Sequence, residues 1–210
     1  MTVASHYDGS ASTYADQYNE EKIWTNEEYP ANFFRLKLVR NLLSEVGAKS
    51  VYEHGVGDAT PLVAVGSDGI RIAGNDVSPE MVKYAKANME SHGFDPEAIA
   101  FLDVQDTNAI AVERERAGQF DAVMALGVIP HVTDDHDFVA SMDAFLRPGG
   151  TMLLQFRNSM FSMFTFNRLT KEFILEDLLV DAPASVRKVV TADLDGRLAV
   201  DKPPMRTRPT

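Results

Sequence analysis

One short stretch, VYEHGVGDATP at residues 51–61, constrains what this chain can fold into more than any other. Apolar residues lead into an acid and two alternate glycines, which are followed by residues typical of a helix start. Gly55 and Gly57 allow a sharp turn with positive φ and let a ligand lie against the main chain. Asp58 or Thr60 can cap the following helix, so that free N–H groups would face the ligand. The stretch predicts a strand, a tight turn and a helix of the nucleotide-binding kind.

Two details of this turn indicate which nucleotide suits it. The dinucleotide fingerprint needs a third glycine three residues after the second, and Thr60 takes that place. Glu53 lies two residues ahead of the first glycine, where its carboxylate would repel a pyrophosphate but suits an ammonium group. A nicotinamide-dependent oxidoreductase, NAD(P)-linked, is therefore the disfavoured alternative.

Three strings of residues resemble one protein family. The pattern E-x-G-x-G-x-A at 53–59 resembles motif I of the class I S-adenosylmethionine-dependent methyltransferases of the small-molecule type. The string GNDVSPEMVKYA at 74–85 resembles the second motif of that family, G-x-D-x-S-x-x-M-x-x-x-A. LRPGG at 146–150, ahead of an apolar strand, is a further signature. The resemblance implies S-adenosyl-L-methionine as cofactor and S-adenosyl-L-homocysteine as product.

The resemblance also implies which residues bind this cofactor. Asp76, at the end of the second strand, would accept both ribose hydroxyls, for which its two oxygens are well shaped. Met81 would lie near the adenine, and Asp103 would accept from the adenine amino group. Asp103 is preferred to Asp106 because Val104 then fills the usual apolar position, with its N–H on a ring nitrogen. The expected cofactor-binding residues are Glu53, Gly55, Gly57, Asp76, Val77, Met81, Asp103, Val104 and Leu126.

Catalysis of methyl transfer needs mainly orientation, because the positive sulfonium already activates the donor. In the family the residue at Leu126 lies near the donor methyl, and His131 falls on a recurrent histidine. A hydroxyl or ammonium acceptor also needs a base, and histidine is suited to that at neutral pH. The alternative is that His131 only holds the turn after the fourth strand. His54 is predicted to be structural, because strand alternation points it away from Glu53.

The acceptor is less constrained by the sequence. Residues 1–29 are polar and aromatic and resemble the lid of small-molecule methyltransferases, with a mobile segment as the alternative. The candidate acceptor-binding residues are Tyr14, Tyr18 and Arg157. We expect a small organic acceptor, O- or N-methylated, such as a sugar or a natural-product intermediate. A non-catalytic scaffold or sensor that binds the cofactor is the other alternative.

Strands alternate with helices over the first 156 residues, which predicts an α/β fold with a doubly wound, mostly parallel sheet and helices on both faces. A helix is expected from Pro30 to about Val46. Residues 186–194 and 197–201 on either side of Asp195-Gly196 predict a β-hairpin. With that hairpin the Rossmann-like methyltransferase fold would have seven strands, in one domain over residues 30–201 with a mobile tail at 202–210.

Composition excludes several other functions. The chain has 210 residues, a net charge of −11 and no cysteine. The negative charge would repel a phosphate backbone, so a nucleic-acid partner is not expected. Without cysteine there is no disulfide or thiolate metal site, and the histidines show no ligand spacing, so we expect no metal. No stretch reaches the length of a membrane span, and a cytoplasmic monomer or homodimer is expected.

Overall fold

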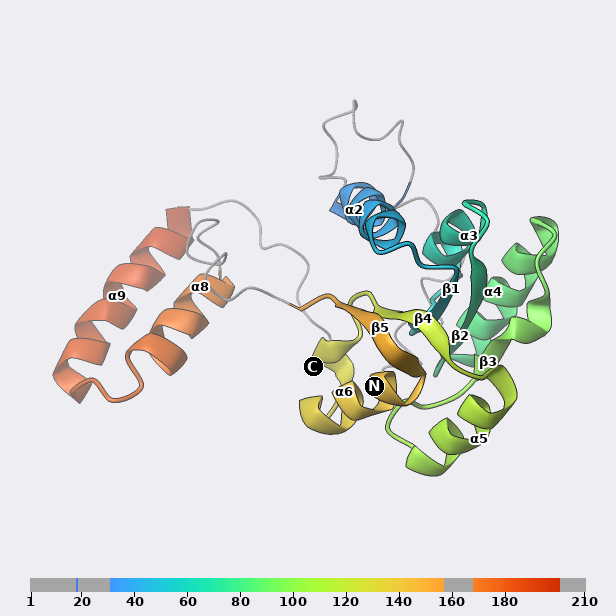
Figure 1. The fold of residues 1–210 in the computed structure, drawn as a ribbon. Helices are drawn as coiled ribbons and strands as arrows, with labels where there is room; N and C mark the ends of the chain where they lie inside the picture. The colour runs from blue at the N-terminus through green and yellow to red at the C-terminus, as the bar shows by residue number, and fades with distance from the viewer. Residues whose placement is uncertain (1–17, 19–30, 157–167, 201–210) are drawn as a thin grey trace. The chain divides into compact units, whose positions relative to one another are not determined.

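The computed structural model describes residues 18, 31–156 and 168–200, and the chain forms two compact units, residues 1–156 and 157–210. In the first unit, five parallel strands form one sheet in the order β3-β2-β1-β4-β5 (Figure 1). The strands are β1 (Ser50–His54), β2 (Arg71–Asp76), β3 (Ile99–Phe101), β4 (Phe120–Ala125) and β5 (Leu146–Leu154). The predicted parallel α/β sheet is confirmed. The prediction of seven strands is wrong, because the described residues form five.

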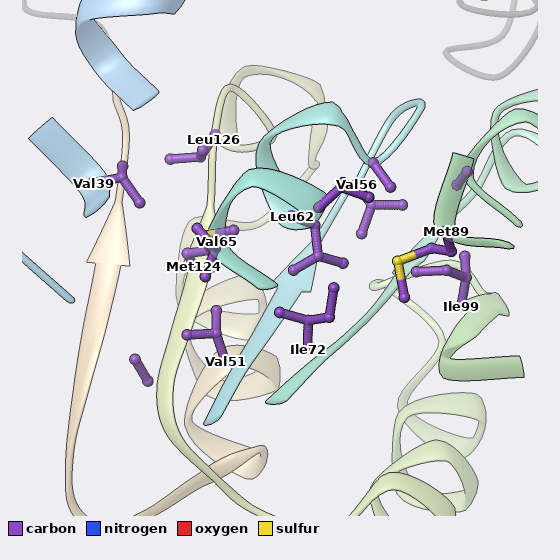
Figure 2. Packing of buried hydrophobic residues seen from close by; sticks show 14 of the residues in the cluster. Val39, Val51, Val56, Leu62, Val65, Ile72, Met89, Ile99, Met124 and Leu126 are labelled. Atoms are coloured by element: carbon purple, nitrogen blue, oxygen red, sulfur yellow. The ribbon is translucent and has the colours of Figure 1, made fainter. Parts of the chain in front are cut away.

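Three helices pack against one face of the sheet, and their apolar side chains form one cluster with the strands (Figure 2). The helices are α2 (Ala31–Glu45), α3 (Thr60–Gly66) and α4 (Pro79–Ser91). Leu62 of α3 and Met89 of α4 belong to the same buried cluster as Val51 of β1. This cluster lies beneath the glycine turn that follows β1.

The other face carries a second buried cluster together with α5 (Thr107–Ala117) and α6 (Asp135–Ala144). Tyr52 belongs to this cluster and stacks on Phe145 with ring centroids 4.1 Å apart. Val51 and Tyr52 are neighbours in β1 and pack on opposite faces, as strand alternation requires. Every residue of β1 is buried, as expected for a central parallel strand covered on both faces.

The carboxyl ends of β1 and β2 approach each other closely at Gly74. Gly74 pairs with Glu53 in the parallel ladder. A Cβ atom on Gly74 would lie 2.5 Å from the Glu53 carbonyl oxygen and 2.4 Å from Val56 Cγ1. Only a residue without a side chain fits here, because the turn after β1 folds back over β2. This contact sets the position of the glycine turn on the sheet.

Two element boundaries differ from the predictions. β5 begins at Leu146 rather than Thr151, and LRPGG belongs to the strand. Phe120 pairs with Leu146 and Ala122 with Thr151, so that residues 147–150 bulge out opposite a single residue of β4. The helix expected from Pro30 to about Val46 is α2, which ends at Glu45; Leu38 within it is 58% exposed, and Val46 just after it is 51% exposed.

The predicted C-terminal β-hairpin is wrong. The second unit contains only helical elements among its described residues: α8 (Arg168–Glu172), a π-helical turn η5 (Phe173–Leu178) and α9 (Ala184–Val200). α9 covers the stretch assigned to the hairpin up to residue 200, and residue 201 lies outside the described residues. Within this unit the Lys171 ammonium forms an ion pair with the Asp195 carboxylate.

The sequence of α9 fits a helix for three physical reasons. Val190, Leu194 and Leu198 recur every four residues and are its half-buried or buried apolar positions. Arg197 Nε donates to Asp193 Oδ2 over 2.8 Å, one turn away. Gly196 does not adopt positive φ, whereas a two-residue hairpin turn needs it. The Asp195-Gly196 pair and the apolar residues on either side of it suggested the hairpin, and helical periodicity outweighs these signals.

We predict that Gly74→Ala destabilises the protein by about 1–3 kcal/mol or more, because the new methyl group would overlap Val56 and the Glu53 carbonyl. The free energy of unfolding in urea, followed by circular dichroism, measures the change. An unfolding free energy equal to that of the wild type would show that the two strand ends can separate at no cost.

Gly196→Ala is the matched control for this change, and it also tests α9. A Cβ on Gly196 meets nothing within 4 Å. Alanine in a helix interior is favoured over glycine by about 0.5–1 kcal/mol, so the helical signal should be retained or should rise. A loss of stability in this variant would favour a turn at residues 195–196.

Candidate active site

The turn after β1 has the sharp backbone that the sequence predicts. Gly55 adopts φ 70° and Gly57 φ 57°, and Ala59 is left-handed with φ 61°. A Cβ on Gly55 would lie 2.5 Å from Val128 Cγ2, so the turn packs directly against the segment after β4. The positive φ of both glycines and the tight turn are confirmed.

The N–H groups of this turn are not free for a ligand, which corrects the expectation from the sequence. Two of them donate to the carbonyl oxygen of Asn75, and one donates to the Asp76 carboxylate. The bonds are Gly55 N to Asn75 O at 2.8 Å, Val56 N to Asn75 O at 3.0 Å, Gly57 N to Asp76 Oδ2 at 2.9 Å, Ala59 N to Val56 O at 2.9 Å and Thr60 N to Asp58 Oδ1 at 3.0 Å. A pyrophosphate would need these donors, so the turn is a poor dinucleotide cradle.

Glu53 is the most unusual group at this edge of the sheet. Its side chain is 1% exposed, and its Oε2 atom has no hydrogen-bond partner. Burial raises the pKa of Glu53 well above the usual range of a glutamate, with the positive charge of Arg35 acting against it and the charges of Asp76 and Asp58 adding to it. A buried carboxyl with an unused oxygen fits an ammonium group, which would satisfy the hydrogen bond and the charge together.

Asp76 holds two loops with its two oxygens. Oδ2 accepts from Gly57 N at 2.9 Å, and Oδ1 accepts from Ser78 N at 2.9 Å. Ser78 in turn caps α4, since its hydroxyl accepts from Met81 N at 3.1 Å. Each carboxylate oxygen can accept more than one hydrogen bond, so this geometry is compatible with the expected ribose contacts.

The other expected cofactor residues lie near the same edge with different exposure. Leu126 directly follows β4 and is buried, and Met81 is 1% exposed in the first turn of α4. Val77 is half-buried and follows β2. Asp103 is exposed two residues after β3, where its carboxylate accepts from Gln105 N at 2.9 Å, and Val104 beside it is half-buried. The parallel register thus brings the ends of β1, β2 and β4 together, with Asp103 on the outer side.

The structure describes the catalytic candidate, His131, and one of the three acceptor-binding candidates, Tyr18. His131 ends the 3-10 turn η4 (Ile129–His131), is half-exposed, and donates its N–H to Val128 O at 2.9 Å. Tyr18 is 9% exposed, and its hydroxyl accepts from Arg35 Nη2 at 2.6 Å. Tyr14 and Arg157 lie outside the described residues.

His54 is structural, as the strand alternation predicts. It is fully buried on the face opposite Glu53, edge-on to the ring of Phe145 at 5.3 Å. Its Nδ1 lies 2.7 Å from Asn75 Oδ1, while Asn75 Nδ2 donates to Leu102 O. Burial lowers the pKa of His54 to about 4, so its ring is neutral near pH 7.

Two residues at this edge were missed by the sequence analysis. Arg35 of α2 and Gln155, which follows β5, are joined by a hydrogen bond of 2.7 Å from Arg35 Nη1 to Gln155 Oε1. A Cβ on Gly127 would lie 3.8 Å from Arg35 Nη1 and 3.7 Å from Gln155 Oε1, so the pair lies beside the turn that follows Leu126. The one signal in the sequence was an arginine inside the apolar run of the helix before β1.

A parallel sheet with a glycine turn and an unsatisfied buried acid at its switch point defines a Rossmann-like domain for a ligand with a cationic end. Residues 52–154 match the family model for the methyltransferase domain. These residues form a methyltransferase domain of the class I S-adenosylmethionine-dependent kind, for which S-adenosylmethionine is the cofactor. The family match decides against the oxidoreductase alternative.

Individual relatives agree with this assignment. The chain is 32% identical over 117 residues to a ubiquinone biosynthesis O-methyltransferase of Methylocella silvestris, covering 56% of this chain and 42% of the relative. It is 28% identical over 143 residues to the enzyme of that name from Xanthomonas axonopodis pv. citri, covering 68% and 57%. The chain thus spans about half the length of these curated relatives.

The fold is shared with a solved structure. The magnesium protoporphyrin IX methyltransferase of Synechocystis PCC 6803 superimposes with a TM-score of 0.53 at 15% identity, covering 69% of this chain and 66% of that one.

Within the described residues, no three His, Cys, Asp or Glu side chains gather in a way that could hold a metal ion. No helix in this part of the chain has the length and apolar character needed to span a membrane.

We predict that Glu53→Gln stabilises the ligand-free protein near pH 7 by roughly 1–3 kcal/mol and weakens binding of S-adenosylhomocysteine. The folded protein binds the Glu53 proton more tightly than the unfolded chain does, because burial raises its pKa. Wild-type stability should therefore fall as the pH rises from about 4 through the folded-state pKa. Glutamine removes this dependence, so the two proteins should be equally stable below about pH 4.

Urea unfolding over a pH series measures the difference, with Glu115→Gln on the exposed surface of α5 as the matched control. If the difference in unfolding free energy between the wild type and Glu53→Gln does not change with pH, the raised pKa of Glu53 is contradicted. Unchanged affinity for S-adenosylhomocysteine would contradict the ammonium contact.

Proposed function

We propose that this protein transfers a methyl group from S-adenosylmethionine to a small organic acceptor, with a hydroxyl oxygen as the favoured acceptor atom. The observation that carries the proposal is the buried Glu53 carboxyl of β1, whose Oε2 has no hydrogen-bond partner. The turn that follows β1 already uses its own N–H groups within the protein. The names of the two curated relatives support O-methylation. Because the chain spans about half of those relatives, their substrate is not transferred to it.

Each residue of the site has a definite part in this proposal. Glu53 binds the ammonium group, and Asp76 accepts from the ribose hydroxyls, since each carboxylate oxygen can accept more than one hydrogen bond. Asp103 and the N–H of Val104 bind the adenine edge, and Leu126 keeps water from the reacting carbon. The bound cofactor supplies a methyl group that its sulfonium already activates. The protein therefore acts mainly by orientation.

His131 is the proposed general base. An imidazole nitrogen takes the proton of the acceptor hydroxyl as the oxygen attacks, and later releases it to water. His131 lies in η4, directly after the segment that packs on Gly55, so it is on the same edge of the sheet as the cofactor residues. If it only holds this turn, the reaction needs no base from the protein.

The proposed acceptor class is based on the net charge of the chain, and the proposed lid is based on the hydrogen bond between Arg35 and Tyr18. The net charge of −11 disfavours a nucleic acid, so a sugar or a natural-product intermediate with a free hydroxyl is the proposed class. The N-terminal segment would form the lid, since the Tyr18 hydroxyl accepts a hydrogen bond from Arg35 beside the site. Amine acceptors remain the second class to screen.

Calorimetric titration with S-adenosylmethionine, S-adenosylhomocysteine and NADH tests the cofactor without knowledge of the acceptor. We expect the first two to bind and NADH not to bind.

Asp76→Ala should weaken the binding of S-adenosylhomocysteine by about tenfold or more, because the variant loses the ribose contacts and leaves the Gly57 N–H without its acceptor. An affinity within about twofold of wild type would mean that the ribose is bound elsewhere.

We predict that His131→Ala lowers turnover of a true acceptor by about 10²-fold or more and leaves S-adenosylhomocysteine affinity within about twofold. The reason is that a base acts on the acceptor and not on the cofactor. Acceptor hydroxyls of several classes, with radiolabelled S-adenosylmethionine, supply the assay. His136→Ala, at an exposed position of α6, is the control. Unchanged turnover in His131→Ala would show that His131 is not the base. If the wild type binds the cofactor but methylates none of the tested compounds, the scaffold alternative is favoured.

A further inference from the structure

Gln105 and Thr133 join two segments of the site by side-chain hydrogen bonds. Gln105 comes one residue after Val104, in the segment that follows β3, and Thr133 comes two residues after His131, in the segment that follows β4. The Gln105 side-chain oxygen Oε1 accepts twice from Thr133, from its backbone N at 2.8 Å and from its hydroxyl Oγ1 at 2.6 Å. The segment expected to bind the adenine is therefore tied to the segment that carries the proposed base.

This contact does not follow from strand pairing. β2 and β1 lie between β3 and β4 in the sheet, so the ends of β3 and β4 are about three strand spacings, or about 14 Å, apart. The two segments lead into α5 and α6, which cover the same face of the sheet, and Val104 and Val132 pack against the one apolar cluster of that face. Two segments of the site thus meet although their strands do not.

The adenine side of the link is held by the carboxylate that is expected to bind the adenine. Asp103 Oδ1 accepts from Gln105 N at 2.9 Å, and the Asp103 carbonyl oxygen accepts from Asp106 N at 3.0 Å. Asp106 caps α5, because its Oδ1 accepts from the backbone N atoms of Asn108 and Ala109. The backbone at Gln105 is therefore fixed between Asp103 and the start of a helix.

The His131 side of the link is a single 3-10 turn. In η4 the backbone N of His131 donates to Val128 O at 2.9 Å, and α6 begins after this turn, with Asp134 as its cap. Between the turn and the cap, Gln105 accepts from both donors of Thr133. A side chain from another segment thus holds the chain just beyond His131.

We propose that Gln105 is a positioning residue for methyl transfer, which binds Thr133 and thereby holds His131 where the base is needed when the adenine lies on Asp103. A base must lie within hydrogen-bond reach of the proton that it removes. A misplacement of about 1 Å can cost about 10²-fold in rate. This inference rests on the proposed function, since Gln105 acts on that reaction through His131.

A role in stability alone is the competing explanation. Gln105 and Thr133 are both exposed, and a hydrogen bond between exposed side chains exchanges with water at little net gain. Two donors that share one acceptor oxygen, however, fix the direction as well as the distance between two segments. We therefore expect the loss of this link to affect turnover more than unfolding.

Hydrogen–deuterium exchange of the full chain tests the link without an acceptor. The probe is S-adenosylhomocysteine at saturating concentration, and exchange is followed in peptides that cover residues 103–106 and 127–134. We expect the ligand to slow exchange in both peptides of the wild type. In Gln105→Met the slowing at 127–134 should be smaller by about threefold or more, while that at 103–106 stays within about twofold of wild type. Gln105→Glu keeps an acceptor oxygen and should restore the slowing.

A double-mutant cycle in turnover tests whether Gln105 acts through His131. We expect Gln105→Met to lower kcat by about threefold to tenfold, with the acceptor KM within about twofold of wild type and with Gln105→Glu close to wild type. In a His131→Ala background the same change should lower kcat by less than about twofold, because no base is left to position.

Gln119→Met is the matched control. Gln119 is also exposed, and its Nε2 donates to Leu146 O at 2.8 Å at the amino end of β4, away from the site. This variant should keep wild-type turnover and wild-type exchange at residues 127–134. Circular dichroism checks that each variant is folded. If Gln105→Met does not fold, Thr133→Val, which removes only the hydroxyl donor, carries both tests.

Three results would overturn the proposal. Equal slowing of exchange at residues 127–134 in the wild type and in Gln105→Met would show that this bond does not link the segments. An equal loss of kcat with and without His131 would show that Gln105 does not act through it, and a lower unfolding free energy with unchanged kcat would make its role structural. Unchanged kcat in His131→Ala alone would instead contradict the proposed base, and the exchange experiment would still decide whether the segments are linked.

Discussion

The close contact between the glycine turn and β2 is the constraint on which the site depends. Gly74 leaves space for Val56 and for the carbonyl of Glu53, and the carbonyl of Asn75 then accepts two N–H groups of the turn. A side chain at position 74 would push the turn off the sheet, and Asp76 would lose its bond to Gly57. Glu53, Asp76 and the turn are therefore one mechanical unit, and their relative positions need no ligand to set them.

This unit is electrostatically unfavourable until a ligand is bound. Three carboxyl groups act on one another at the strand ends, and burial raises the pKa values of Glu53 and Asp58. Arg35 offsets part of this effect, and Tyr18 and Gln155 hold Arg35 in place. Such a site lowers the stability of the free protein in exchange for binding, as is common for preorganised sites. The free protein keeps its shape because both faces of β1 are packed with apolar side chains.

The sequence predicted the parts of this protein that depend on local backbone chemistry. Positive φ at Gly55 and Gly57 follows from residue type and is confirmed. It did not predict that the turn N–H groups are used inside the protein, because their acceptor Asn75 lies on another strand. Arg35 was missed for the same reason, since its partners are far away in the sequence. The hairpin failed because the Asp195-Gly196 pair and the apolar residues on either side of it were preferred to helical periodicity in α9.

The extra residues at the start of β5 have a consequence for how this sheet can change in evolution. Residues 147–150 loop out opposite Asp121, whose carboxylate pairs with Arg147, and the ladder resumes at Ala122 and Thr151. The irregularity lies at the amino end of the strands, opposite the site. Insertions or deletions of a residue there can be absorbed locally, so Gln155 would keep its place beside Arg35. Length variation among homologues should therefore gather at this corner, while the distance from Thr151 to Gln155 stays constant.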